Sequence, residues 1–392
     1  MVSLLFAACS KTDSPAAPQE IFDSLKGQSI TTNGWADMAN DGEGLFYADP
    51  ENFTLIEGPA TPAKREAFTD AINSDDEKFI IVSGDIDLSD GKINDDDKSF
   101  FNQFQDTAPY ARINGDIVFD IGSNTTIIGV NNARLMFGGL RIIDKTNVII
   151  RNVTFYDAHG STENDTSQPG YAASKANIDA LVVRGTSSGV WVDHCKFTDG
   201  ICEDMIRNYN HDGAFDIPEG KNITVSWCEF TNHDKVMLVA INDSEASAVV
   251  EDRQITLHHN YFHHATQRMP RTRGTQMHVY NNYYRDIGTE GNSGYCLGPG
   301  INAHFIVENN FFDTATFFHP VNTDVHDEGR YDNAQYPAIV WAAGNNVTVI
   351  PSRHDPDNGS VKPWEPAYSY SPEPNDGLPE SIPAGAGPVL VF

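Results

Sequence analysis

The sequence is poor in cysteine and in basic residues, and it has no long apolar run. Five cysteines occur in 392 residues, and no two of them have the short paired spacing of a structural zinc site. Lysine and arginine number 26 against 55 aspartates and glutamates, a formal net charge of −29, which excludes the clustered basic surface that binds nucleic-acid phosphates. No apolar run reaches the roughly 20 residues of a transmembrane helix. A chain with this negative charge favours the binding of cations. It repels an anionic ligand unless metal ions or local basic residues offset the charge.

The first residues differ from the rest of the chain. Residues 4–8 are apolar or small and precede Cys9, an arrangement that resembles the end of a bacterial lipoprotein signal with a lipid-bearing cysteine. Residues 10–20 have the polar, proline-bearing composition of a tether. We expect a signal remnant over 1–9, a tether over 10–20 and a lipid anchor at Cys9. The protein would then be exported, as a bacterial outer-membrane or cell-surface lipoprotein or in secreted form; a frayed N-terminus is the alternative.

A short motif repeats six times in the middle of the chain. Each copy has an aliphatic residue, an aromatic residue five positions later, and usually Asn or Cys two positions before the aromatic. The copies are 150–155, 192–197, 225–230, 257–262, 279–284 and 307–312, with 42, 33, 32, 22 and 28 residues between successive aromatics. A strand alternates its faces with period two, so an offset of five requires a bend between the two apolar positions. Coils that bend at one place and stack on each other predict an all-β protein, a single-stranded right-handed parallel β-helix.

Stacking would place equivalent residues of the motif in internal columns. One column would contain Val153, Cys195, Cys228, Asn260, Asn282 and Asn310, and the other Phe155, Phe197, Phe230, Phe262, Tyr284 and Phe312. Stacked asparagines can satisfy each other's amides and the backbone groups of the bend. Cys195 and Cys228 fall on adjacent coils, where they either form a disulfide or pack as free thiols, and free packing is slightly favoured.

One domain is therefore expected over residues 21–392. Residues 21–75 would cap the N-terminal end of the β-helix and include a short helix over 64–73. The proline-rich tail after Pro351 would lie across the outside as loops.

Charged residues gather on or just after these coils. Asp212 and Asp216 are four positions apart, so on a strand they share a face, and Asp179 lies about one coil earlier at a comparable place. Three converging carboxylates make a hard oxygen site suited to Ca²⁺ rather than to a soft transition metal. Two nearby groups are read as structural instead. The first is the histidines of 258–264, with transition-metal binding as the alternative. The second is the Asp193–His194 pair, with a catalytic dyad as the alternative.

The motifs, in their order, resemble those of pectate lyases of polysaccharide lyase family 1, which have a pectin lyase-like β-helix. The resemblance covers nearly all of the expected mature sequence. The segments that carry it are 71–86, 122–129, 147–155, Trp191-Val-Asp-His194, Asp212-Gly-Ala-Phe-Asp216, Arg268-Met-Pro-Arg-Thr-Arg273 and Ala384-Gly-Ala-Gly-Pro388.

This resemblance implies roles for individual residues. Asp179, Asp212 and Asp216 would hold the primary Ca²⁺, Arg268 would be the catalytic base, and Lys235 and Arg273 would bind substrate carboxylates. Relatives often have a further acidic residue at the position of Asn177. This departure weakens the case for an additional calcium ion near that point, although the asparagine still offers a carbonyl oxygen, and the number of calcium ions stays open. We expect a monomer with no nucleic-acid partner.

The implied reaction is β-elimination on α-1,4-linked polygalacturonate, giving 4,5-unsaturated oligogalacturonates. A carboxylate makes its α-hydrogen a poor acid, and a cation that neutralises it stabilises the enolate-like intermediate. Two alternatives stay open: a pectin lyase acting on methyl-esterified substrate, which needs no calcium bridge, and a non-catalytic sugar-binding β-helix. A hydrolase would require paired carboxylates around a water molecule, which the arginine-rich segment fits poorly.

Overall fold

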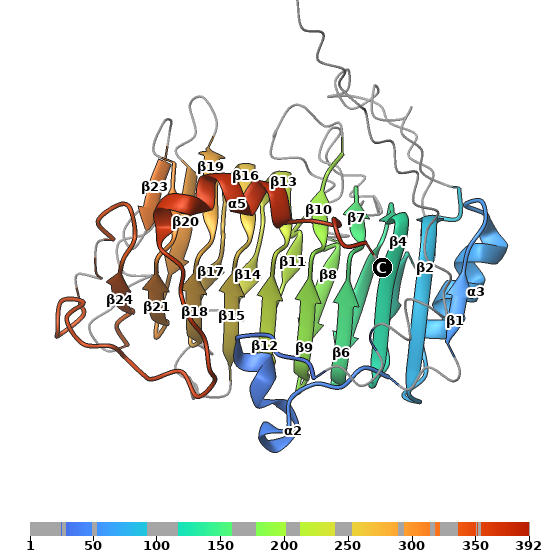
Figure 1. The fold of residues 1–392 in the computed structure, drawn as a ribbon, viewed down its shortest axis with the longest axis horizontal. Coiled ribbons are helices and arrows are strands. Elements are labelled where there is room, and N and C mark those ends of the chain that lie inside the picture. Colours follow the sequence, from blue (N-terminus) through green and yellow to red (C-terminus); the bar gives the residue numbers. More distant parts are fainter. Residues whose placement is uncertain are drawn as a thin grey trace, which may run out of the picture.

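A computed structural model describes residues 25, 29–48, 53–91, 117–158, 178–200, 212–239, 253–288, 294–313, 318–321, 336–349, 351 and 354–391. These residues stack as parallel strands side by side along the long axis of the molecule (Figure 1). None of the helices in this part of the chain is long and apolar enough to cross a membrane. The predicted signal remnant, tether and Cys9, together with Asn177, lie outside the described residues.

Two series of strands flank the predicted bend, and each strand pairs in parallel with its counterparts on the adjacent coils. The series before the bend is β6 (Thr146–Arg151), β9 (Ser188–Asp193), β12 (Lys221–Ser226), β15 (Gln254–His258), β18 (Gln276–Tyr280), β21 (His304–Glu308) and β24 (Ile339–Ala343). The series after it is β7 (Thr154–Tyr156), β10 (Lys196–Thr198), β13 (Glu229–Lys235), β16 (Tyr261–Gln267), β19 (Tyr283–Ile287) and β22 (Phe311–Phe312). Long β4 (Thr125–Met136) pairs with both β6 and β7 and with β2 (Lys78–Asp87), which also pairs with β1 (Thr54–Ile56).

A third series closes each coil and carries the predicted site. Its first part is β3 (Val118–Asp120), β5 (Gly139–Ile143), β8 (Leu181–Arg184) and β11 (Phe215–Asp216). Its second part is β14 (Leu238–Val239), β17 (Arg271–Thr272), β20 (Gly294–Pro299) and β23 (Phe318–Val321). A single bridge between Ile217 and Val239 links the two parts. The predicted parallel β-helix is confirmed.

The bend has the same backbone geometry in every coil. The residue just before each Asn or Cys position adopts a positive φ, as in Asn152 (60°), Trp227 (50°) and Asn281 (53°). This left-handed turn reverses the alternation of the strand and so brings the aliphatic and the aromatic residue to the same interior. The six aromatics pair in register and are buried, with ring centroids 4.6–5.0 Å apart.

The asparagine column forms a continuous ladder. The backbone N–H groups of Cys228, Asn260 and Asn282 each donate to Oδ1 of the asparagine in the next coil, at 2.9 Å. The ladder extends one coil further than predicted, to Asn345, whose Oδ1 accepts from the Asn310 backbone at 2.8 Å. That seventh copy escaped the motif search because Ala342 and Val347 stand at the aliphatic and aromatic positions.

Cys195 and Cys228 are free thiols buried in this column, as the favoured interpretation expected. Each Sγ lies 3.6 Å from the carbonyl of the aliphatic residue one coil earlier, Ile150 and Val192 respectively. The amide of Asn260 donates to the equivalent carbonyl of Val225 at 3.0 Å. The thiols therefore take the place of the ladder amides, and burial raises the pKa of Cys228.

The N-terminal part does more than cap the end of the helix. Helix α3 (Pro62–Ile72), which begins after the Thr61 cap, packs with β1 and β2 at the N-terminal end, close to the predicted 64–73. Residues 29–48, with η1 (Trp35–Met38) and α2 (Ala39–Gly42), instead lie along the side of β9 and β12 (Figure 1). Their backbone is held there partly by the Ala36 N–H, which donates to Oγ1 of Thr224 at 2.9 Å.

The C-terminal tail crosses the outside, as predicted, but it is not all loop. It includes η5 (Asn375–Gly377) and α5 (Leu378–Gly385), and α5 lies across the outside of the β-helix (Figure 1). Helix α5 buries Leu378 and Ile382 against Tyr283. Further on, Leu390 pairs its backbone with the side chain of Asn152 at 2.9 Å. The tail thus runs back along most of the β-helix.

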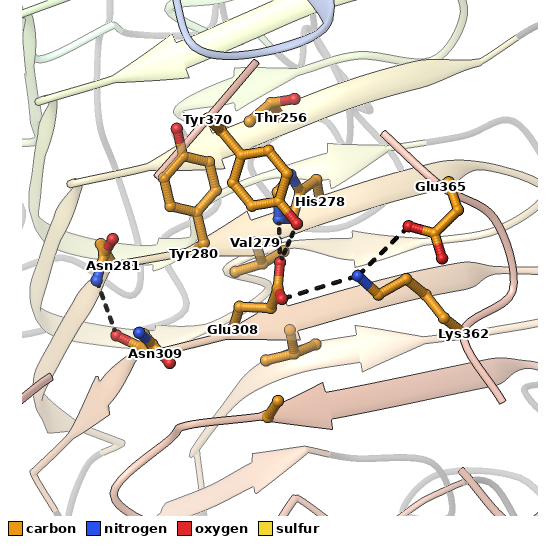
Figure 2. A network of polar contacts seen from close by, with 12 residues as sticks. Thr256, His278, Val279, Tyr280, Asn281, Glu308, Asn309, Lys362, Glu365 and Tyr370 are labelled. Atoms are coloured by element: carbon orange, nitrogen blue, oxygen red, sulfur yellow. Dashed lines mark hydrogen bonds and ion pairs between the residues drawn. The ribbon is translucent and has the colours of Figure 1, made fainter. Parts of the chain in front are cut away.

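A polar network fastens the middle of this tail to the sheet, centred on Glu308 of β21 (Figure 2). Its Oε2 lies 2.9 Å from Nε2 of buried His278 and accepts from the Tyr370 hydroxyl at 2.8 Å. Lys362 reaches Oε1 of Glu308 at 3.9 Å, and Tyr368 lies 2.7 Å from Nδ1 of His278. This network lies on the first series of strands, away from the third series that carries the predicted site.

Candidate active site

Two of the three predicted carboxylates converge on one glycine. Asp179 precedes β8, and Asp216 ends β11 on the next coil. The Gly213 N–H donates to Oδ1 of Asp179 at 2.6 Å. A Cβ placed on Gly213 would collide with Oδ1 of Asp216 and lie 2.8 Å from Oδ1 of Asp179. The bare glycine therefore leaves room for two carboxylates at a point that any other residue would fill.

Burial and mutual repulsion make these carboxylates poor acids. Burial, together with the charges of Asp216 and Asp212, raises the pKa of Asp179 to about 8. Burial likewise raises the pKa of Asp216 to about 6, although the Leu238 N–H that donates to its Oδ1 works in the opposite direction. Like charges held together in a poorly solvated place are stabilised by a cation between them.

The carboxylate of Asp212 has a partner that the sequence did not predict. Its carboxylate forms an ion pair with Nζ of Lys235, the last residue of β13. Within the described ranges, no three His, Cys, Asp or Glu side chains form a group that could hold a metal ion. The structure thus brings Asp179 and Asp216 together and places Asp212 beside them in contact with an ammonium group.

The three predicted cations lie at or just after the ends of strands near Asp216. Lys235 is the strand partner of Gln267, the last residue of β16, and Arg268 directly follows Gln267. The main chain of Arg273, just after β17, donates to the Val239 carbonyl at 3.1 Å. Both arginines therefore lie on the coil that follows the one containing Lys235.

Arg268 has two unusual features. Its φ is 65°, a left-handed conformation that residues other than glycine and asparagine seldom adopt. Its Nε is buried and has no hydrogen-bond partner among the described residues. The charge of its guanidinium lowers the pKa of Asp216, so the two groups are electrostatically linked. The structure thus places a strained, incompletely satisfied arginine beside the acidic pair.

Sequence reasoning missed two residues beneath the site, His233 and Asp199. His233 is buried on β13 and lies 2.8 Å from Oδ1 of Asp199 and 3.1 Å from the carbonyl oxygen of Asp212. The sequence feature that could have indicated His233 is its place two residues before Lys235.

The donor set fits a hard cation. The available groups are carboxylate oxygens, which Ca²⁺ prefers, and Gly213 leaves space where two of them meet. Asp212 could join Asp179 and Asp216 by exchanging its ammonium partner for the metal. No thiol or imidazole nitrogen is directed at this point by any contact in the described part of the chain.

Comparison with known proteins identifies the family of the chain. A family model described as pectate lyase matches residues 24–375, nearly the whole described chain. The chain belongs to the pectate lyase family. This confirms the resemblance drawn from the motifs.

Individual relatives cover different shares of the chain. Pectate trisaccharide-lyase of Thermotoga maritima is 39% identical over 180 residues, 44% of each chain, so the match spans less than half of that relative's length. Pectate lyase D of Dickeya chrysanthemi is 29% identical over 382 residues, 93% of this chain and 90% of the relative. A pectate lyase from a Bacillus species, solved in complex with trigalacturonate, superposes with a TM-score of 0.63 at 25% identity, covering 90% of this chain and 98% of that one.

Proposed function

We propose that the protein is a calcium-dependent pectate lyase that cleaves α-1,4-linked polygalacturonate by β-elimination and releases 4,5-unsaturated oligogalacturonates. The observation that carries this proposal is the meeting of Asp179 and Asp216 at Gly213, next to Lys235 and Arg268. A cation-binding pair beside fixed positive groups suits an anionic sugar chain. It also explains how a protein of charge −29 can bind one.

In this proposal Asp179, Asp212 and Asp216 hold the metal. Calcium, when bound, would neutralise the substrate carboxylate and so make the adjacent C5 hydrogen more acidic. Lys235 and Arg273 bind substrate carboxylates and hold the sugar ring in register with the metal-binding carboxylates. Arg273 is suited to this because a guanidinium pairs with a carboxylate through two parallel hydrogen bonds.

Arg268 is the proposed base. In its neutral guanidine form the side chain takes the C5 proton, and the electron pair of the C5–H bond forms the C4–C5 double bond. The bond from C4 to the glycosidic oxygen breaks, and that oxygen leaves with the bonding pair and takes a proton from water. An arginine is normally protonated, with a pKa above about 12. An alkaline medium increases the neutral fraction of any arginine. The Nε of Arg268 is buried and has no hydrogen-bond partner among the described residues.

The cellular setting is part of the same proposal. Export as a lipoprotein acylated at Cys9 or as a secreted protein, and a monomeric state, are supported by the sequence alone, since residues 1–20 lie outside the described residues. Mass spectrometry of the protein from its native membrane would test the acylation at Cys9.

The test of function is an absorbance assay with three substrates or conditions. Polygalacturonate with Ca²⁺ should give the ultraviolet absorbance of the unsaturated product, and excess chelator should abolish it. Methyl-esterified pectin serves as the comparison, because a pectin lyase would prefer it and would not need calcium. Reducing ends without absorbance would indicate a hydrolase, and binding without either would indicate a sugar-binding protein. Full activity in chelator would reject the calcium role.

A further inference from the structure

His233 is a buried group that contacts the main chain of Asp212 and that the proposed mechanism does not use. Its side chain is 4% exposed, and its strand neighbour across the sheet, Ala265, is fully buried. It therefore points into the β-helix, beneath the surface that carries Asp212 and Lys235.

Both ring nitrogens of His233 face groups that can only accept. Nδ1 lies 2.8 Å from a carboxylate oxygen of Asp199, and Nε2 lies 3.1 Å from the main-chain carbonyl of Asp212. An ionised carboxylate and a carbonyl have no proton to give, so the ring donates from both sides.

The residue before it makes a parallel contact. Asn232 adopts a positive φ of 51°, and its side-chain amide donates to the Gly200 carbonyl at 3.2 Å. Asn232 and His233 together therefore hold residues 199 and 200 on one side and residue 212 on the other. The same strand ends at Lys235, whose ammonium group contacts the carboxylate of Asp212.

We propose that His233 is a positioning residue for the cation site. Anchored by Asp199, it fixes the main chain of Asp212, so that the Asp212 carboxylate is presented to the point where Asp179 and Asp216 meet. This inference rests on the proposed calcium-dependent function. Groups that orient metal ligands from behind commonly change metal affinity by roughly 10- to 100-fold when they are replaced.

The competing explanation is that His233 only stabilises the fold. His278 provides a matched control, because it is equally buried and also bonds a carboxylate, Glu308, at 2.9 Å. It lies on β18 in the tail network, on a different series of strands (Figure 2). Losing either histidine should lower stability, but only loss of His233 should change calcium binding.

The experiment is calorimetric titration of the full chain with Ca²⁺ in the absence of substrate, accompanied by thermal unfolding. His233→Gln and Asp199→Asn should each weaken calcium binding roughly 10-fold or more. His278→Gln should lower the unfolding temperature and leave the calcium dissociation constant unchanged. In lyase assays at limiting Ca²⁺ the two site variants should lose activity, and excess Ca²⁺ should restore most of their kcat.

The outcomes distinguish a failure of the proposed function from a failure of the positioning role of His233. If the parent protein binds no calcium, the proposed function fails and this inference fails with it. If the parent binds calcium and the folded His233→Gln or Asp199→Asn binds it equally well, only the positioning role is overturned. If His233→Gln does not fold, Asp199→Asn decides the question, because it keeps the buried ring and removes its anchor. A parallel loss of affinity in His278→Gln would assign the effect to general destabilisation.

Discussion

Asp179 and Asp216, from consecutive coils, present their carboxylates to the same glycine, Gly213. Parallel stacking alone brings residues of successive coils within reach of each other, about 4.8 Å apart. What distinguishes this place is that both side chains are acidic and largely removed from water. The arrangement is unfavourable without a cation, which is the physical basis of the proposed calcium site.

Asp216→Asn should weaken calcium binding roughly 10-fold or more, because an amide offers the metal a neutral oxygen in place of a charged one. The amide oxygen can still accept from the Leu238 N–H, so the fold should be kept. Calcium titration and lyase activity at limiting Ca²⁺ would measure the change. Asp120→Asn is the control, since that carboxylate lies on the same series of strands but is exposed and paired with Arg141. Unchanged calcium dependence in Asp216→Asn would reject the ligand assignment.

Lys235→Met should move calcium affinity and activity in opposite directions. Removing the ammonium frees Asp212 from its ion pair, so calcium should bind as tightly or up to about fivefold more tightly, as an ion pair worth at most about 1 kcal/mol implies. Activity should fall, because a cation that binds the substrate is lost. Calorimetry and steady-state kinetics would check both effects, with Lys235→Arg as the charge-conserving control. Weaker calcium binding in Lys235→Met would show that the lysine supports the metal site instead of competing for Asp212.

Arg268→Lys and Arg273→Lys should have different kinetic defects. If Arg268 takes the C5 proton, its replacement should remove most turnover despite the conserved charge. If Arg273 only clamps a carboxylate, its replacement should mainly raise the substrate concentration required. In the parent, the rate should increase toward alkaline pH.

Both arginine variants would be assayed at several pH values under saturating Ca²⁺, after circular dichroism has confirmed an intact β-helix. Near-parental turnover in Arg268→Lys, or the same defect in both variants, would place the base elsewhere.

Stability should fall as the pH drops from about 6.5 toward 4, partly because of His258 and His259. Burial lowers the pKa of His258 to about 4, and burial with the neighbouring ring lowers the pKa of His259 to about 3. Above about pH 6.5 both rings are neutral in either state, so they have no effect there. Below it only the unfolded chain takes up protons, which costs roughly 1.4 kcal/mol per pH unit for each ring.

His259→Asn should reduce the loss of stability per pH unit on acidification. Position 259 has a positive φ, and the same position in the next two coils is already asparagine, Asn281 and Asn309. Urea unfolding at pH 7, 6, 5 and 4 would measure the difference. His264→Asn, also at a positive φ but with an exposed side chain, is the control and should keep the parental slope. An unaltered slope in His259→Asn would mean that other groups cause the acid loss.

The repeated motif allowed the sequence to predict the β-helix, its two internal columns and the neighbouring coils on which the acidic and basic residues lie. This worked because each coil encodes its own bend within six residues. Other features depend on contacts that no local pattern encodes. Helix α5 contains Pro383 and resembles a loop in sequence, yet apolar contacts with Tyr283 hold it in place. The ion pair between Asp212 and Lys235 likewise depends on how one coil is offset from the next.

The asparagine ladder fixes the spacing between successive coils near the site. From Cys228 to Asn345 the chain between successive ladder positions varies from 22 to 35 residues, yet every rung fixes the next coil at one strand spacing, about 4.8 Å. Asp216, Leu238 and Arg271 accordingly occupy successive steps of the third series, because Asp216 precedes the Ile217–Val239 bridge and Leu238 pairs with Arg271. The loops between coils can therefore differ in length while the spacing between the acidic and basic groups stays constant. A polymer of repeating units would meet these groups at that constant spacing.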